Sequence, residues 1–410
     1  MNKFLHRWLA ISFFNLLLVA CLGVLLRYKI AFSFPVMEQK HVLHSHSHFA
    51  FAGWITQTLM VLLVHYLCLH KGEIVIKRYR WLLYANMITA YGMLIAFILQ
   101  GYGSFSISFS TLSIFTSYFF AWYFWKDLDS IGGNKVTHYW FKAGLLFNIL
   151  SSIGAFGLAF MMANNIIHQN WYLATVYFFL HFQYNGWFFF AGMGLLVSRL
   201  ETMSNSIKIL RSIFWLFFLA CLPAYFLSAL WLPFPDIIYG VILIAVIAQL
   251  AGWYLMIRFL LKYKKILQTT FSRYGRILLL LSAIAFTIKI MLQSGSIHPA
   301  LSQLSYGFRP IVIGYLHLVL LGVISVFIIG YIVSLELIQV SKIMITGIFI
   351  FVAGVIINEL LLMWQGVSAL NYNSIPYMNE LLFSSAVLLF SGAGILFLSS
   401  LRKPASVTNS

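Results

Sequence analysis

Three of the twelve histidines share a local pattern in which a large apolar residue follows the imidazole and a glycine stands five positions after it. The pattern occurs at His48–Gly53, His181–Gly186 and His317–Gly322. The histidines are 133 and 136 residues apart, so one falls in each third of the 410-residue chain. Neutral imidazole is the commonest protein ligand for metals and binds iron, copper and zinc. The spacing therefore predicts one candidate metal or cofactor ligand in each third.

The first of these histidines belongs to a cluster of four within eight residues: His41, His44, His46 and His48. In a helix, His41, His44 and His48 fall on one face, whereas His46 points nearly opposite. We predict that His44 or His48 is a buried ligand. The others, His46 included, could complete a metal site, or the cluster could be solvated beside its neighbouring serines.

The composition shows what kind of scaffold must position these imidazoles. Hydrophobic residues make up 62% of the chain and charged residues only 9%, whereas a soluble domain has about 25% charged residues. Ordinary soluble enzymes, disordered proteins and secreted disulfide frameworks are excluded. The three cysteines, Cys21, Cys68 and Cys221, form no CxxC or zinc-ligand spacing. We predict an all-α polytopic membrane protein whose main partner is the lipid bilayer.

Apolar runs of about 20 residues, long enough to cross the hydrocarbon core, recur along the whole chain. The connections between them are too short for a separate soluble domain. The stretch 308–366 is divided at Ser341–Lys342. The twelve predicted spans are 5–27, 41–66, 80–101, 105–125, 140–163, 170–198, 209–231, 236–261, 275–294, 308–337, 342–366 and 377–401.

Twelve spans assign each of the 26 Lys and Arg residues to one side of the membrane. One side collects 21 of them, and the other holds only Arg27, Lys29, Lys40, Lys289 and Arg309. This asymmetry predicts a bacterial inner membrane protein with cytoplasmic N and C termini. The net charge of +17 is thereby explained by topology, and we expect no nucleic-acid partner.

The histidine pattern falls on the second, sixth and tenth predicted spans, which all run from outside to inside. We therefore predict a single membrane domain of three pseudo-repeated four-helix units, approximately 1–138, 139–274 and 275–410. The three imidazoles then lie at similar depth in the outer half of the bilayer, where ionisable groups are expensive and usually functional. The glycine of each pattern would let a flat group or a neighbouring helix approach.

On these residues the chain resembles the catalytic subunit of the haem–copper oxidases, in particular cbb3-type oxidases and nitric oxide reductases. The resemblance implies twelve helices in three arcs and a b-type haem. The segment with His44 and His48 resembles the one that carries an axial ligand of the low-spin haem. His317 matches the second position of the family's His-x-His segment, the other axial ligand, and Tyr315 stands at the first position, which would hold a high-spin haem.

The resemblance also implies a copper ligand at His181, but the span 209–231 has no histidine to complete the copper site. Tyr315 could replace the missing high-spin haem ligand, because tyrosine ligates haem in some proteins. Arg309 could pair with a haem propionate or with a lipid phosphate. The implied activity is electron transfer or the binding or reduction of O2 or NO. A cytochrome or a quinol would supply the electrons.

Two alternatives remain from the sequence. The motif His44-Ser-His46-Ser-His48 also resembles NnrS-type membrane proteins, which implies a haem- or copper-binding protein for NO response or metal handling. Lys289 and Glu359 lie inside predicted spans, next to the amides of Gln293 and Asn358. These groups could line a proton path, move protons or cations in a transporter that has lost the cofactor, or simply pair to fix helix packing.

Overall fold

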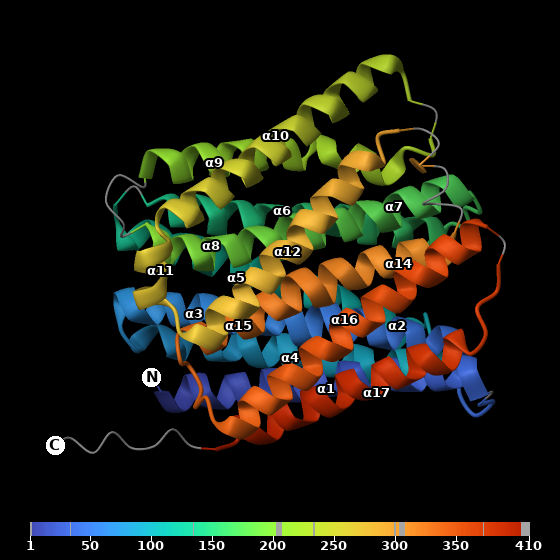
Figure 1. Cartoon of the computed structure of the whole chain (residues 1–410), viewed down its shortest axis with the longest axis horizontal. Helices are drawn as coiled ribbons and strands as arrows, with labels where there is room; N and C mark the ends of the chain where they lie inside the picture. Colours follow the sequence, from blue (N-terminus) through green and yellow to red (C-terminus); the bar gives the residue numbers. More distant parts are fainter. Residues whose placement is uncertain are drawn as a thin grey trace. The chain divides into compact units, whose positions relative to one another are not determined.

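A computed structural model describes residues 2–32, 34–133, 135–201, 207–232, 234–298, 301–302, 308–371 and 373–402. Within these ranges the chain forms helices and turns and contains no strand (Figure 1). The predicted all-α fold class is confirmed. A helix satisfies its backbone hydrogen bonds internally, which an apolar chain needs in lipid.

The described helices follow one another with short connections. In chain order they are α1 (Asn2–Phe32), α2 (Gln39–Phe49), η1 (Ala50–Thr56), α3 (Gln57–Lys71), α4 (Ile74–Gln100), α5 (Ser104–Ile131), α6 (Val136–Ala163), α7 (Gln169–His181), η2 (Phe182–Phe188), α8 (Phe189–Leu200), α9 (Ile207–Cys221), η3 (Pro223–Ala229), α10 (Asp236–Lys262), α11 (Lys264–Thr270), α12 (Arg273–Gly295), α14 (Arg309–His317), η4 (Leu318–Ser325), α15 (Val326–Ser334), α16 (Lys342–Leu370) and α17 (Met378–Ser400). Each range predicted to span the membrane falls on one helix or on a run of consecutive helical segments.

The predicted division of the stretch 308–366 is confirmed. Helix α15 ends at Ser334 and α16 begins at Lys342. The hydroxyl of Ser341 accepts a hydrogen bond from the backbone N–H of Met344 at 3.2 Å. A serine in this position satisfies one of the free N–H groups of the first helical turn, which explains why the new helix starts here.

Nine helices of the described part are long and apolar enough to cross a membrane, or ten if α9 and η3 form one span bent by 45° at Pro223. Proline removes a backbone donor and favours such a bend. The two other predicted spans, α5 and the run 169–200, are helical, but their many serines, amides and interfacial aromatics lower their hydropathy. The chain is a multi-pass membrane protein, and the number twelve stays a prediction.

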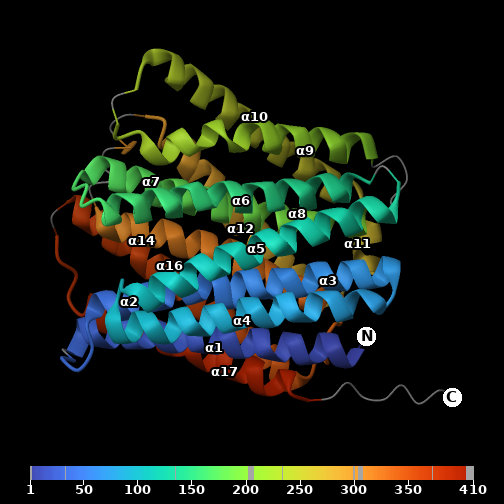
Figure 2. The same cartoon turned by 180° about the vertical axis from the view of Figure 1, so that it is seen from behind.

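The chain divides into two compact units, each described by itself. Unit 1 comprises Met1–Phe120, Ser272–Leu281 and Ser325–Ser410, and unit 2 comprises Ala121–Phe271 and Ser282–Ile324. In unit 1, α17 packs against both α16 and α1, so the first and last helices lie side by side (Figures 1 and 2). In unit 2, α6 packs against α7, η2 and α8, and α9 packs against α10.

Aromatic side chains fill much of the interior of unit 2. The fully buried Trp140 lies 5.1 Å from the ring of Phe190 and 5.3 Å from that of Phe214. Phe189 stacks on Phe286 of α12 with 4.9 Å between centroids and 8° between planes. Aromatic pairs of this kind contribute about 0.5–1.5 kcal/mol beyond the area that they bury. These rings pack α6, α8, α9 and α12 against one another.

Candidate functional site

A π-helical segment begins within two residues after each of the three pattern histidines. The segments are η1 (Ala50–Thr56), which begins two residues after His48, η2 (Phe182–Phe188), which begins directly after His181, and η4 (Leu318–Ser325), which begins directly after His317. π-Helical turns are rare and often mark functional sites. The repeated sequence pattern therefore has a repeated backbone feature, which periodicity alone did not indicate.

Side chains of neighbouring helices bind the backbone of η1. Asn15 of α1 donates from Nδ2 to the carbonyl of Gly53 at 2.5 Å, and Asn86 of α4 donates to the carbonyl of Ala52 at 3.1 Å. Tyr91 donates its hydroxyl to Oδ1 of Asn15 at 2.7 Å. Backbone polar groups in a membrane interior need partners, so these amides stabilise the irregular turn.

The other two segments are bound in the same way within unit 2. The thiol of Cys221 lies 3.7 Å from the carbonyl of Asn185 in η2. The hydroxyl of Ser282 on α12 donates to the carbonyl of Val323 in η4 at 2.8 Å. All three segments thus have a carbonyl that accepts a hydrogen bond from a side chain of another helix.

The glycine of each pattern contacts protein side chains. A Cβ added to Gly53 would lie 2.6 Å from the ring of Phe49, and one added to Gly186 would lie 2.5 Å from Cβ of Phe147. At Gly322 the nearest atom would be Cβ of Ala285, at 3.3 Å. The sequence predicted that these glycines would let either a flat group or a neighbouring helix approach. In the structure they let protein side chains pack closely.

His44 and His48 meet two aromatic residues that sequence reasoning missed. His48 stacks on Phe97 of α4 with 4.3 Å between centroids and 22° between planes, and its Nε2 lies 3.2 Å from the hydroxyl of Tyr102. The ring of His44 meets that of Tyr102 edge-on at 4.6 Å. The predicted shared face of His44 and His48 is confirmed. Its partners follow from the tight turn between α4 and α5, for which a glycine on each side of Tyr102 was the available signal.

His46 points the other way, as predicted. Its Nδ1 lies 3.1 Å from the carbonyl of Val19 on α1. His41 lies on the face shared with His44 and His48, because a Cβ added to Gly101 would lie 2.5 Å from its Nε2. The histidines of α2 therefore point in two directions: His46 contacts α1, and the other three contact the end of α4 and the turn that follows it.

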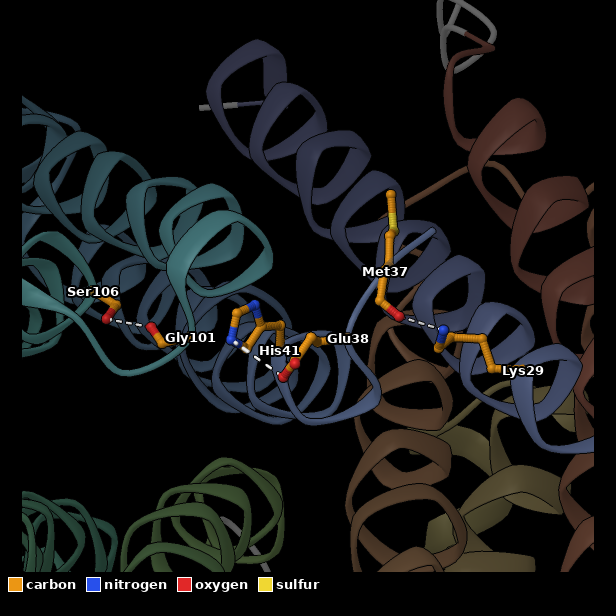
Figure 3. Close-up of polar contacts among 6 residues, drawn as sticks. All are labelled: Lys29, Met37, Glu38, His41, Gly101 and Ser106. Atoms are coloured by element: carbon orange, nitrogen blue, oxygen red, sulfur yellow. Dashed lines mark hydrogen bonds and ion pairs between the residues drawn. The ribbon is translucent and has the colours of Figure 1, made fainter. Parts of the chain in front are cut away.

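The turns beside His41 are held by polar contacts (Figure 3). His41 Nε2 lies 3.8 Å from a carboxylate oxygen of Glu38. Lys29 donates from Nζ to the carbonyl of Met37. Ser106 donates to the carbonyl of Gly101, whose φ of +62° favours glycine, at 2.7 Å. The first two contacts lie at the start of α2, and the third lies in the turn between α4 and α5 that His41 faces.

His181 is fully buried and both of its ring nitrogens have partners. Nε2 lies 2.8 Å from the carbonyl of Cys221, and Nδ1 lies 3.1 Å from Nδ2 of Asn185. A carbonyl only accepts, so Nε2 carries the proton and the Nδ1 lone pair accepts from the amide. A metal would have to replace one of these bonds. The observed contacts therefore fit a packing role for His181 and do not fit copper.

Lys289 is buried in unit 2, with only 3% of its surface exposed. Its Nζ lies 5.5 Å from the ring centroid of Phe286. Among the residues that the structure describes, no carboxylate pairs with it. One turn further along α12, Gln293 donates to Oε1 of Gln249 at 3.3 Å.

The remaining candidates of unit 2 lie along α14. Arg309 is the first residue of this helix and is exposed. The ring of Tyr315 meets that of Tyr184 in η2 at 6.3 Å. Tyr184 in turn lies 6.4 Å from His181. The tyrosines therefore join the region of His181 to α14.

His317 contacts the backbone of its own helix. Its Nδ1 lies 2.8 Å from the carbonyl of Ile313. A carbonyl acceptor fixes the neutral tautomer with its proton on Nδ1 and places the lone pair on Nε2, the arrangement usual for metal-binding histidines. His317 therefore fits a haem-ligand role. It belongs to unit 2, whereas His44 and His48 belong to unit 1.

Glu359 lies midway along α16 in unit 1. Its Oε1 accepts a hydrogen bond from Nδ2 of Asn358 at 3.2 Å. Oδ1 of Asn358 accepts from the hydroxyl of Ser385 on α17 at 3.3 Å. The carboxyl is therefore connected to the contact between α16 and α17.

In the described ranges, no group of three or more His, Cys, Asp and Glu side chains is arranged to hold a metal ion. The histidine-rich α2 thus does not by itself form a three-ligand centre. No model of a known protein family matches the chain, and no curated protein is significantly similar to it.

Proposed function

We propose that this protein is a haem-binding membrane protein for electron transfer or for the binding or reduction of O2 or NO. The observation that carries the proposal is the coincidence, in three helices, of a histidine, a π-helical segment and a glycine at matching positions. A pattern repeated three times in sequence and backbone supports the three-arc scaffold of the haem–copper oxidase catalytic subunit, which the sequence resembles.

The proposed topology has twelve transmembrane helices in three four-helix units, near 1–138, 139–274 and 275–410, with cytoplasmic termini in a bacterial inner membrane. The helical boundaries support this count, because most of each predicted span lies on helical residues. The distribution of basic residues supports the orientation.

The proposed axial ligands are His317 and either His48 or His44. The Nδ1 bond of His317 to its own helix orients Nε2 as a ligand, and the stacking of His48 on Phe97 fixes the plane of that imidazole. A b-type haem supplies reversible one-electron chemistry and an affinity for diatomic gases. Tyr315 stands at the position that would hold a high-spin haem, and the proposal includes only the low-spin haem.

Two further residues complete the proposal. Arg309, at the start of α14, would pair with a haem propionate. The electron donor is a quinol or a cytochrome. Copper at His181 is not part of the proposal, because both ring nitrogens of this histidine already have partners.

The test is haem content and a reduced-minus-oxidised spectrum of the protein purified from haem-replete cells. We expect about one haem per chain with the sharp bands of six-coordinate low-spin iron. His317→Ala should lose these bands. The matched control is His70→Ala, because His70 makes the same contact to the carbonyl four residues earlier, at 2.9 Å, but at an exposed helix end. A featureless wild-type spectrum would overturn the proposal.

A second candidate is a proton or cation transporter without cofactor. The buried Lys289, which has no carboxylate partner in the described part of unit 2, favours it. In that case Glu359→Gln and Lys289→Gln would abolish uptake into vesicles, whereas His317→Ala would not. An NnrS-type metal-handling role would instead show copper or zinc bound without haem and retained in His317→Ala.

A further inference from the structure

Unit 1 has an open groove of about 760 Å³ between α1, α4 and α17. His6, Arg7, Ile11 and Phe14 of α1 line it, with Tyr91 of α4 and Phe397 of α17 opposite. The rings of Phe14 and Phe397 lie 5.1 Å apart and tie α1 to α17. None of the histidines near the π-helical segments lines this groove, so it is separate from the candidate haem site.

The groove is polar at one end only. Arg7 lies in the second turn of α1, about 7 Å from the helix start at a rise of about 1.5 Å per residue, which is the level of lipid headgroups. Its side chain is exposed and has no acidic partner among the described residues. Beside it, His6 Nε2 lies 3.0 Å from the carbonyl of Arg402. Beyond these residues the walls are apolar.

The wall formed by Tyr91 also offers no polar atom to a ligand. Its hydroxyl is bonded to Asn15, whose amide is bonded in turn to the carbonyl of Gly53 in η1. The deep part of the groove therefore presents ring faces and methyl groups. A quinol headgroup, which needs hydrogen-bonding partners, would find none there.

We propose that the groove binds an anionic phospholipid. The phosphate pairs with Arg7 at the headgroup level, and one acyl chain lies along Ile11 and Phe14 towards Tyr91. Charge complementarity supports an anionic lipid, because the chain has 26 basic and 9 acidic residues, and on the proposed topology 21 of the basic residues lie on the side where α1 begins. The occupied groove stabilises α1 against α4 and, through Asn15, the contact with η1. This binding site is independent of the proposed haem function.

The experiment compares lipids that differ only in headgroup. The full chain is purified in mild detergent, delipidated and titrated with palmitoyl-oleoyl phosphatidylglycerol or palmitoyl-oleoyl phosphatidylcholine. Thermal unfolding and native mass spectrometry are the readouts. We expect phosphatidylglycerol to raise the Tm and to stay bound at lower concentrations than phosphatidylcholine does.

Two variants make the test specific. Arg7→Gln should weaken phosphatidylglycerol binding about fivefold, the loss expected for one basic residue beside an anionic lipid, and should leave phosphatidylcholine binding unchanged. Arg258→Gln is the matched control, because Arg258 is an exposed arginine of unit 2 that does not line the groove. Ile11→Trp should fill the groove and prevent retention of both lipids.

Three results would overturn the proposal. The first is equal affinity of the wild type for the two lipids. The second is an unchanged phosphatidylglycerol preference in Arg7→Gln. The third is tighter binding of a short-chain ubiquinone that competes with phosphatidylglycerol and does not depend on Arg7, which would assign the groove to a quinone. The lipid affinities of the wild type and of Arg7→Gln test the proposal even if Ile11→Trp does not fold.

Discussion

Trp54 donates its indole N–H to the hydroxyl of Ser325 at 2.9 Å, and both side chains are 1% exposed. Trp54 lies in η1 and Ser325 is the last residue of η4. Both residues belong to unit 1, although 271 residues separate them in the sequence. The bond therefore joins η1 to the residue at which η4 ends.

Loss of the hydrogen bond between Trp54 and Ser325 should lower the stability of the folded protein. We expect Trp54→Phe and Ser325→Ala each to lower the free energy of unfolding, with a coupling of about 0.6 kcal/mol between them, the average for hydrogen bonds between membrane helices. A double-mutant cycle measured by unfolding in mixed micelles checks it. Strictly additive effects of the two substitutions would show that the bond contributes nothing.

Two of the pattern glycines, Gly186 and Gly322, should differ in their tolerance of alanine. At Gly186 the new Cβ would lie 2.5 Å from Cβ of Phe147, so we expect a loss of about 1–3 kcal/mol from overpacking. At Gly322 the nearest atom would be 3.3 Å away, and the loss should be smaller. Gly240, which has no atom within 4 Å of an added Cβ, is the control and should tolerate alanine. Thermal unfolding of the purified variants ranks their stabilities, and equal Tm values for the three variants would contradict the prediction.

Replacement of Lys289 by methionine should stabilise the protein. The ammonium group is buried without a carboxylate partner in the described residues, and methionine has a similar shape without the cost of desolvating a charge. We expect a higher Tm for Lys289→Met. Lys142→Met, which removes the ion pair between Lys142 and Asp129, should leave the Tm unchanged or slightly lower. A decrease for Lys289→Met would indicate that the ammonium makes a favourable interaction.

The predicted orientation can be tested by labelling. In a variant without native cysteines, Ile167→Cys lies in the connection between α6 and α7, at a residue that is 99% exposed. A membrane-impermeant maleimide should label it in intact spheroplasts. Glu73→Cys, in the turn between α3 and α4, should react only after the membrane is opened. Labelling of both from the same side would contradict the twelve-span topology.

The helices could be predicted from the sequence because lipid leaves the backbone few alternatives. An apolar run between basic or glycine-containing turns is enough to place a helix, as the boundary at Ser341 shows. The shared face of His44 and His48 also followed from helical geometry alone. Membrane helices are in this respect easier to predict than the helices of soluble proteins.

The contacts of the candidate site could not be predicted in the same way. The partners of His181 include Cys221, which is 40 residues away and had no recognisable motif. Asn185 stands one turn after His181, and this spacing is the signal in the sequence that the two side chains meet. The π-helical segments depend on amides of other helices, such as Asn15 and Asn86, and a pattern that assumes 3.6 residues per turn does not reveal them.

The π-helical segments also change the rotational phase of the helices that contain them. One extra residue in a turn displaces everything beyond it by about 100° around the axis relative to an unbroken α-helix. A helical wheel drawn through His48 and continued past Thr56 would therefore place the later side chains on the wrong face of the helix. Deletion of a single residue within η1 would remove this displacement and rotate α3 by about 100° relative to the helix that carries His48. The length of each π-helical segment thus sets the rotation between the histidine before it and the side chains of the helix after it.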